Sequence, residues 1–504
     1  MADDNLSPGV KKTDEPETLE LPRMVAGSLA VYFGPGIILM MTGIGTSHLI
    51  TAPVAGGRFE FALLWCIPVA YIFKYYGFEM AFRFTHATGR SMLDAYATAW
   101  KKWPLWYVLI TTLIQMAIGQ AGRLIAAAAV MYYFLSEYLG VQITYQGASG
   151  DVDLGIPVYA FLLGAFSVVI IQRGNYGAVE LVAKISAGVL VLSSMAVYVY
   201  QPAPLSAMGH FFVFETPQGS WLIIAAFLGL LPTGMDVSLQ ASEWGKAKKI
   251  GTCRVRKQME EKGLIRAFDP LTARKEDLTA DLTELPPHTR EYCLRWFKIG
   301  LWDFRLGHIV SFVIVCIFLL LAAVSIYPSE VEGRAVMEEI AGIFPPGMKI
   351  VFWIGAFAAT FSTSFNYFDG WPRVVSVCCR NMFRPTAKLS GIVKKDLSPE
   401  HRRAWYSEYN LYRGAMFFSL IASVILIAGV PKPVWLVLVA SALAFFIAPV
   451  IFFLNFYYCL TVIPKKDKSF YPSTFAIVFG SLSLIIFTGL TVLLIMARVF
   501  KVFD

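Results

Sequence analysis

The chain is 504 residues long; 57% of its residues are apolar and only 15% are charged, which gives a mean hydropathy of +0.59. Soluble domains carry about 25% charged residues, so this composition excludes a water-soluble globular protein and indicates an integral membrane protein. The formal net charge of +8 gives no reason to expect a nucleic-acid partner, because the basic residues gather in alternate loops.

Apolar stretches of membrane-spanning length follow one another along almost the whole chain. A helix needs about 20 apolar residues to cross the hydrocarbon layer, and about eleven stretches meet this requirement. The sequence therefore predicts an all-α membrane protein with about 11 transmembrane helices, preceded by a polar cytoplasmic tail over residues 1–28. The predicted spans are 29–54, 60–83, 104–134, 156–172, 178–200, 218–245, 304–327, 347–371, 410–429, 434–462 and 472–497.

Lysine and arginine are unevenly distributed among the loops between these spans. Loops on the side of the N-terminus are rich in them, above all the polar stretch 247–303, whereas the opposite loops at 136–155 and 201–220 contain none. Basic loops stay in the cytoplasm, so we expect a cytoplasmic N-terminus and, with an odd number of spans, an extracellular C-terminus. The expected location is the plasma membrane.

Two of the predicted spans are interrupted by small and polar residues. The first, Pro35–Pro53, contains the run TGIGTSH, and the sixth, Trp221–Trp244, contains LPTGMD. Unwound backbone occurs in membranes only where it lines a cavity or is buried in protein. Paired interruptions in two halves of a chain therefore point to the substrate site of a transporter. The second break also holds Asp236, and an acid inside a span is expected to be functional.

The two breaks together form a candidate cation site. Carbonyl groups at a half-helix C-terminus carry partial negative charge, so the carbonyls of 42–45 and 231–234 are predicted to face a cation whose charge partner is Asp236. Oxygen ligands with one carboxylate suit a hard, partly hydrated cation such as Mg²⁺, whereas His48 and Met235 leave a transition metal open. The predicted ion-binding residues are Gly45, Thr46, Ser47, His48, Thr233, Gly234, Met235 and Asp236, of which Asp236, Thr46, Ser47, Thr233 and Gly45 are the predicted metal contacts.

These residues also have purely structural interpretations. Asp236 could only cap the half-helix that begins at Val237, and Ser47 could satisfy freed backbone groups. His48 could be a hydrogen-bonded residue of the pathway wall, and Met235 could simply pack in the core.

Three other polar features of the spans are expected to be structural. Arg123 is expected to pair with an acid on a neighbouring helix, although it could also set the field of a vestibule. Lys74 and Glu79 are expected to lie near a cytoplasmic end, where helix-spaced pairing and snorkelling account for them. The run Ser362–Ser364 is expected to join helices, with the pathway wall as the alternative.

Several motifs resemble the Nramp superfamily of divalent-metal transporters. They are Gly34-Pro35-Gly36, Leu63-Leu64-Trp65, Thr88-Gly89, Tyr176 with Glu180, the sixth span, and Ala358-Ala359 with Ser362-Thr363. The resemblance covers most of the membrane portion. It implies a leucine-transporter-like 5+5 inverted repeat with broken helices 1 and 6. The first five-helix repeat would cover 29–200, the second 201–463 with its cytoplasmic loop 247–303, and an eleventh helix and the C-terminus 464–504.

The chain departs from the family pattern at the site itself. The family's Asp-Pro-Gly-Asn aligns with Gly45, Thr46, Ser47 and His48, and its Met-Pro-His-Asn aligns with Thr233, Gly234, Met235 and Asp236. Acids of the family's proton path align with Gln120 and Arg123, a later histidine with Gln240, and a ligand-region glutamine with Ser441.

This pattern resembles the branch of Nramp-related magnesium transporters. The resemblance implies facilitative passage of Mg²⁺, and also of Mn²⁺, by alternating access without proton coupling. The metal ions are substrates, and no resident cofactor is expected. The expected partners are divalent cations and the lipid bilayer, and the expected state is a monomer.

The sequence leaves two other transport functions open. A proton-coupled Mn²⁺/Fe²⁺ transporter and an amino-acid or organic-solute carrier of the same fold both remain alternatives, although Asp236 would repel a substrate carboxylate. An enzyme is not expected, because the polar segments contain no nucleophile–base pair, phosphate loop or zinc-ligand spacing.

Overall fold

The structure is a computed structural model, and it describes residues 19–23, 31–45, 47–147, 150–329, 335–394, 397–429 and 433–499. Most of the predicted tail 1–28, the candidate ligand Thr46 and residues 500–504 lie outside the described residues. The described chain is helical except for one antiparallel hairpin, β1 (Thr144–Gly147) with β2 (Gly150–Asp153).

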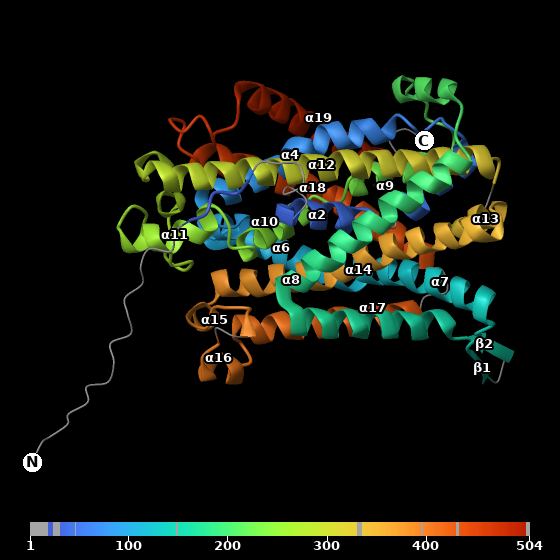
Figure 1. Cartoon of the computed structure of the whole chain (residues 1–504), viewed down its shortest axis with the longest axis horizontal. Coiled ribbons are helices and arrows are strands. Elements are labelled where there is room, and N and C mark those ends of the chain that lie inside the picture. Colours follow the sequence, from blue (N-terminus) through green and yellow to red (C-terminus); the bar gives the residue numbers. More distant parts are fainter. Residues whose placement is uncertain are drawn as a thin grey trace, which may run out of the picture.

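The helices form a bundle of long, mostly apolar rods (Figure 1). Two π-helical turns, η1 (Ser47–Thr51) and η3 (Gln115–Gly119), interrupt the α-helical series. Short 3-10 turns are η2 (Trp100–Lys102), η4 (Leu205–Phe212), η5 (Lys275–Leu278) and η6 (Leu282–Glu284). The α-helices are α2 (Pro35–Gly43), α3 (Ala52–Phe59), α4 (Cys66–Thr88), α5 (Met92–Tyr96), α6 (Trp103–Ile114), α7 (Gln120–Leu139), α8 (Gly155–Tyr200), α9 (Trp221–Leu230), α10 (Val237–Ala247), α11 (Thr252–Glu261), α12 (Pro287–Ser325), α13 (Ala335–Ile343), α14 (Pro346–Met382), α15 (Arg384–Lys388), α16 (Pro399–Arg403), α17 (Glu408–Gly429), α18 (Pro433–Val462) and α19 (Thr474–Val499).

Within the described ranges, nine helical stretches are long and apolar enough to cross a membrane. Two of them, Gly155–Gly174 and Tyr176–Tyr200, belong to α8, which folds back on itself in Figure 1, so the two predicted spans 156–172 and 178–200 both exist. The second and sixth predicted spans are not among the nine. The second, α4, carries three charged residues, and the sixth is broken after the ten residues of α9.

Two helices extend well beyond the predicted spans. α12 begins at Pro287, so the predicted loop 247–303 ends earlier than expected and also contains α11. α14 continues to Met382 instead of ending near residue 371. Charged residues place a stretch outside the hydrocarbon layer, but they do not end a helix. α12 has 39 residues, and at about 1.5 Å per residue it is longer than a hydrocarbon layer about 30 Å thick.

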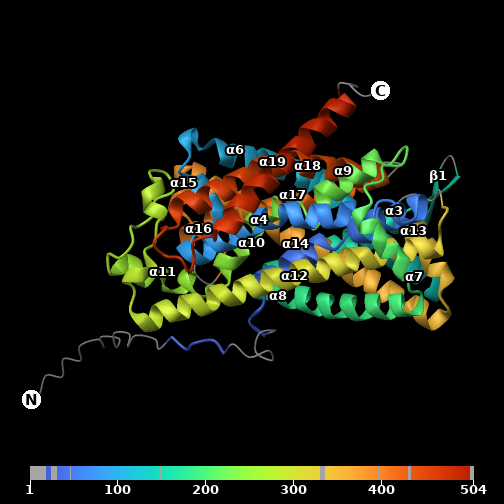
Figure 2. The ribbon, with the colours of Figure 1, turned by 90° about the horizontal axis from the view of Figure 1, so that it is seen from above.

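The connecting segments sort to the two ends of the bundle. Figure 1 shows α11, α15 and α16 at one end, and the β1–β2 hairpin with α13 at the other. Figure 2, seen from above, shows the same separation. The basic loops of the sequence therefore share one end, as alternation of spans requires.

A buried carboxylate caps the first half of the first broken helix. Asp303 of α12 accepts hydrogen bonds from the main-chain N–H groups of Gly34 (2.9 Å), Gly36 (2.7 Å) and Ile37 (3.0 Å). These are donors that the first turn of a helix leaves without partners, and their partial positive charge favours an anion. A Cβ at Gly36 would lie 2.4 Å from the main-chain carbon of Asp303, so only glycine allows this close approach.

Replacing Asp303 by alanine is expected to lower the free energy of unfolding by about 2 kcal/mol, because it leaves several buried N–H groups without acceptors. Thermal unfolding of the purified protein measures this loss. Asp303→Asn keeps one acceptor oxygen and should fall between alanine and the unchanged protein. Equal melting temperatures for Asp303→Ala and the unchanged protein would show that this cap contributes nothing.

Candidate ion site at the two helix breaks

The two predicted breaks exist, and they touch each other. α2 ends at Gly43 and the chain resumes in the π-turn η1, while α9 ends at Leu230 and α10 begins only at Val237. Pro232 explains the second interruption in part, because proline has no N–H group to donate within a helix. A Cβ at Gly43 would lie 2.2 Å from the carbonyl oxygen of Pro232, so the two unwound segments are in direct contact.

Most carbonyl groups of the first break already have partners within the protein. The hydroxyl of Thr363 on α14 lies 2.8 Å from the carbonyl oxygens of both Met41 and Ile44. The Gly45 carbonyl accepts from the N–H of Leu49 (2.9 Å), and Ser47 Oγ lies 3.2 Å from the Gly43 carbonyl. Each carbonyl oxygen has a second lone pair, so the prediction that the carbonyls of 42–45 face a substrate ion stays a prediction. Thr363 joins α14 to the end of α2, as expected for the run Ser362–Ser364.

The carbonyl groups of the second break do face a cation, but it is a side chain of the protein. Lys74 Nζ lies 2.8 Å from the Leu231 carbonyl oxygen and 2.7 Å from that of Thr233. Lys74 is fully buried in the middle of α4, and Glu79 pairs with Arg83 instead (2.6 Å). The expectation of a snorkelling Lys74–Glu79 pair is therefore wrong, because four main-chain carbonyls satisfy the buried ammonium.

Both ring nitrogens of His48 are engaged in hydrogen bonds. Nδ1 lies 2.9 Å from Ser47 Oγ, and Nε2 lies 3.1 Å from the Tyr71 hydroxyl and 3.0 Å from Ser311 Oγ. A neutral imidazole has one donor and one acceptor nitrogen, so neither is free to ligate a metal in this structure. The prediction of His48 and Ser47 as ion ligands is replaced by a buried hydrogen-bonded chain.

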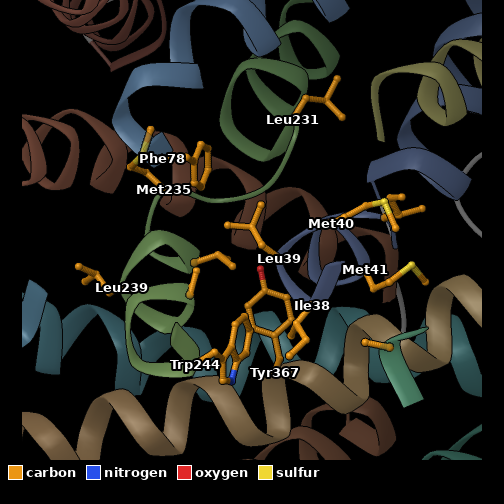
Figure 3. Close-up of a cluster of buried hydrophobic side chains, with 14 of the residues drawn as sticks. Ile38, Leu39, Met40, Met41, Phe78, Leu231, Met235, Leu239, Trp244 and Tyr367 are labelled. Carbon is orange, nitrogen blue, oxygen red and sulfur yellow. The ribbon is translucent and has the colours of Figure 1, made fainter. Parts of the chain in front are cut away.

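Met235 points into the apolar core and away from the breaks. Figure 3 shows its side chain beside Phe78 of α4, and a Cβ at Gly77 would lie 2.9 Å from its sulfur atom. The prediction of Met235 as an ion-binding residue is therefore not met, and packing accounts for it. Its neighbour Gly234 lies against the Asp236 carboxylate, since a Cβ there would meet Asp236 Oδ1 at 2.3 Å.

Asp236 occupies the junction between the unwound segment and α10. It is the one residue between Leu231 and Gln240 that is not fully buried. Its side chain makes no capping hydrogen bond to α10, which argues against the cap-only interpretation. Instead, Trp371 Nε1 of α14 donates to Asp236 Oδ2 at 3.0 Å.

Two aromatic side chains and an arginine complete the surroundings of Asp236. The Tyr367 hydroxyl lies 3.3 Å from Thr233 Oγ1, and Figure 3 shows the Tyr367 ring extending toward the first broken helix. The Arg123 guanidinium stacks 4.0 Å from the Tyr367 ring centroid and 4.9 Å from that of Trp371. Arg123 thus contacts aromatic rings and the Gly119 carbonyl at 2.7 Å. Its charge also interacts with the Asp236 carboxylate at the start of α10, an acid on a neighbouring helix as we expected.

The described residues contain no group of three or more His, Cys, Asp or Glu side chains that could hold a metal ion. Asp236 is therefore a single carboxylate, with the Arg123 guanidinium also in its surroundings. Lys74, Tyr367 and Trp371 were not among the predicted site residues. A lysine in the middle of an apolar span is itself a functional signal, whereas nothing in the sequence singles out the two aromatic residues.

Two broken helices that meet beside one intramembrane carboxylate, within a bundle of membrane-spanning helices, define a multi-pass membrane transporter and not an enzyme. A model of the family described as natural resistance-associated macrophage protein-like matches residues 36–497. The chain therefore belongs to this family, Nramp, as its motifs suggested.

Comparisons with individual solved structures show the same fold. A mutant of the manganese transporter of Eremococcus coleocola has 14% sequence identity and a TM-score of 0.61, with 97% of this chain and 91% of that chain covered. The nucleobase-cation-symport-1 family transporter Mhp1 has 13% identity and a TM-score of 0.53, with 94% of each chain covered. These likenesses confirm the leucine-transporter-like fold class. An uncharacterised protein of Pasteurella multocida is 21% identical over 353 residues, 68% of either chain.

Proposed function

We propose that the protein carries partly hydrated divalent cations, Mg²⁺ and Mn²⁺, across the membrane by alternating access and without proton coupling. The observation that carries this proposal is Asp236, a carboxylate without a capping bond and not fully buried, at the place where two broken helices touch. Family membership supports metal transport, and a fold neighbour is named a manganese transporter.

The ligand chemistry supports hard cations. Thr233 and Tyr367 offer hydroxyl groups close to the break, while the sulfur of Met235 packs in the core. A site without thioether or free imidazole loses its preference for soft transition metals. One carboxylate with neutral oxygens suits an ion that keeps several waters.

Proton coupling is the second candidate, because one observation favours it. His48, Tyr71 and Ser311 form a buried hydrogen-bonded chain next to the first break, and such chains can relay protons. Against it, the positions that align with the family's proton-path acids hold Gln120, which donates to the Ser364 carbonyl at 3.1 Å, and Arg123.

Uptake by proteoliposomes tests the proposal. One batch of vesicles encloses a dye that Mn²⁺ quenches, and a parallel batch encloses a dye that reports the internal pH. Mg²⁺ is added outside the vesicles as a competitor. We expect Mn²⁺ entry that Mg²⁺ inhibits, with no acidification beyond that of protein-free vesicles. Acidification that follows Mn²⁺ entry would establish the proton-coupled alternative, and inhibition by amino acids without metal uptake would establish the organic-solute carrier.

We also propose that the N-terminus is cytoplasmic, the C-terminus extracellular, and the protein a monomer of the plasma membrane. The gathering of α11, α15 and α16 at one end of the bundle supports the first two points, because the basic loops of the chain lie in these segments.

A further inference from the structure

The end of α9 holds the ammonium group of Lys74. Its Nζ atom lies 2.8 Å from the Gly229 carbonyl oxygen and 3.3 Å from that of Leu228, in addition to the Leu231 and Thr233 carbonyls. All four acceptors are main-chain oxygens, and an ammonium has three N–H donors to share among them. The side chain is fully buried, and its charge lies 5.8 Å from the ring centroid of Phe487 on α19.

These carbonyls need a cation because of the way the helix ends. The last carbonyls of a helix have no N–H partners and carry partial negative charge. In water they would be hydrated, but here they converge in a buried region, since the helix ends before Pro232 and the next helix does not begin until Val237. Several carbonyl oxygens that converge on one point form the kind of cage that binds small cations.

We propose that this cage is a cation site that the chain fills with its own lysine. Lys74 is a positioning residue. Its ammonium group, attached to α4, holds the end of α9 in place, and without it the carbonyl groups there would need a free ion. It follows that removing the side chain should create a binding site for a free monovalent cation. This inference does not depend on which ion the protein transports.

The test is the melting temperature of the full-length purified protein, followed by tryptophan fluorescence in choline chloride, NaCl or KCl of equal ionic strength. The unchanged protein should melt at the same temperature in all three salts. Lys74→Ala should melt several degrees lower in choline and should recover part of the loss in NaCl or KCl, saturably with concentration, because an ion that binds only the folded state stabilises it.

Lys349→Ala is the matched control, because Lys349 pairs with Glu137 away from the breaks; it should show no difference between the salts. Lys74→Ala with the same salt response as this control would overturn the proposal. Lys74→Met keeps most of the length of the side chain without its charge, and it is the second test variant if Lys74→Ala does not fold. A lower melting temperature for Lys74→Met supports the tethered cation, and a melting temperature equal to that of the unchanged protein overturns it.

Discussion

Replacing Asp236 by asparagine is expected to reduce the initial rate of Mn²⁺ and Mg²⁺ uptake by about 100-fold or more. The variant removes the one negative charge at the junction of the two breaks, and losing one partner of a desolvated charge pair costs about 2–5 kcal/mol. Asparagine keeps an oxygen that can accept the hydrogen bond from Trp371 Nε1, so the fold should survive. The measurement is uptake by proteoliposomes at matched protein content.

Glu291→Gln is the control for a general effect of removing an acid, since Glu291 forms an exposed pair with Arg295 and should transport normally. The melting temperature of Asp236→Asn should stay near that of the unchanged protein. If Asp236→Asn transports both ions at the normal rate, Asp236 is not the charge partner of the substrate and the proposed site must be abandoned.

Replacing Gly43 by alanine is expected to destabilise the protein by about 2 kcal/mol and to lower uptake by at least about tenfold. The added Cβ would lie 2.2 Å from the Pro232 carbonyl oxygen and 3.2 Å from Thr233 Cβ. A main-chain oxygen cannot rotate away as a flexible side chain could, so the two unwound segments must separate. Thermal unfolding and uptake by proteoliposomes measure the two effects.

Gly414→Ala in α17 is the matched control, because a Cβ there would meet nothing within 4 Å. Alanine in a helix is usually more stable than glycine by about 0.5–1 kcal/mol, so this variant should be neutral or slightly stabilised. Gly43→Ala should therefore lower the free energy of unfolding, whereas Gly414→Ala should leave it unchanged or raise it. An unimpaired Gly43→Ala would mean that the breaks do not need to touch.

The sequence predicted those features that depend on local composition. Apolar length predicted the spans, and the small and polar runs at TGIGTSH and LPTGMD predicted the two breaks, because unwound backbone requires such residues. The ends of α12 and α14 were missed, since a helix does not stop where the membrane does. The fold class and the family were also predicted correctly.

The side-chain partners at the site could not be predicted, because they join segments that are distant in the chain. Lys74 contacts carbonyl groups 154 to 159 residues away, and Trp371 reaches Asp236 across 135 residues. Periodicity and composition describe a segment and its own faces. They do not indicate which unpaired carbonyl groups a buried ammonium contacts. The carbonyls of Leu231 and Thr233 were therefore predicted to face the transported ion.

The Asp303 cap has a consequence for how such a molecule can move. Three hydrogen bonds tie the N-terminus of α2 to α12, and α2 and α12 are in extensive contact. A motion that keeps these hydrogen bonds must move α2 and α12 together as one rigid body. α3 lies equally close to α12, because a Cβ at Gly56 would lie 2.2 Å from the Leu319 carbonyl oxygen. Both halves of the first broken helix therefore move with α12, and the second broken helix, α9 and α10, is the one that can shift against them.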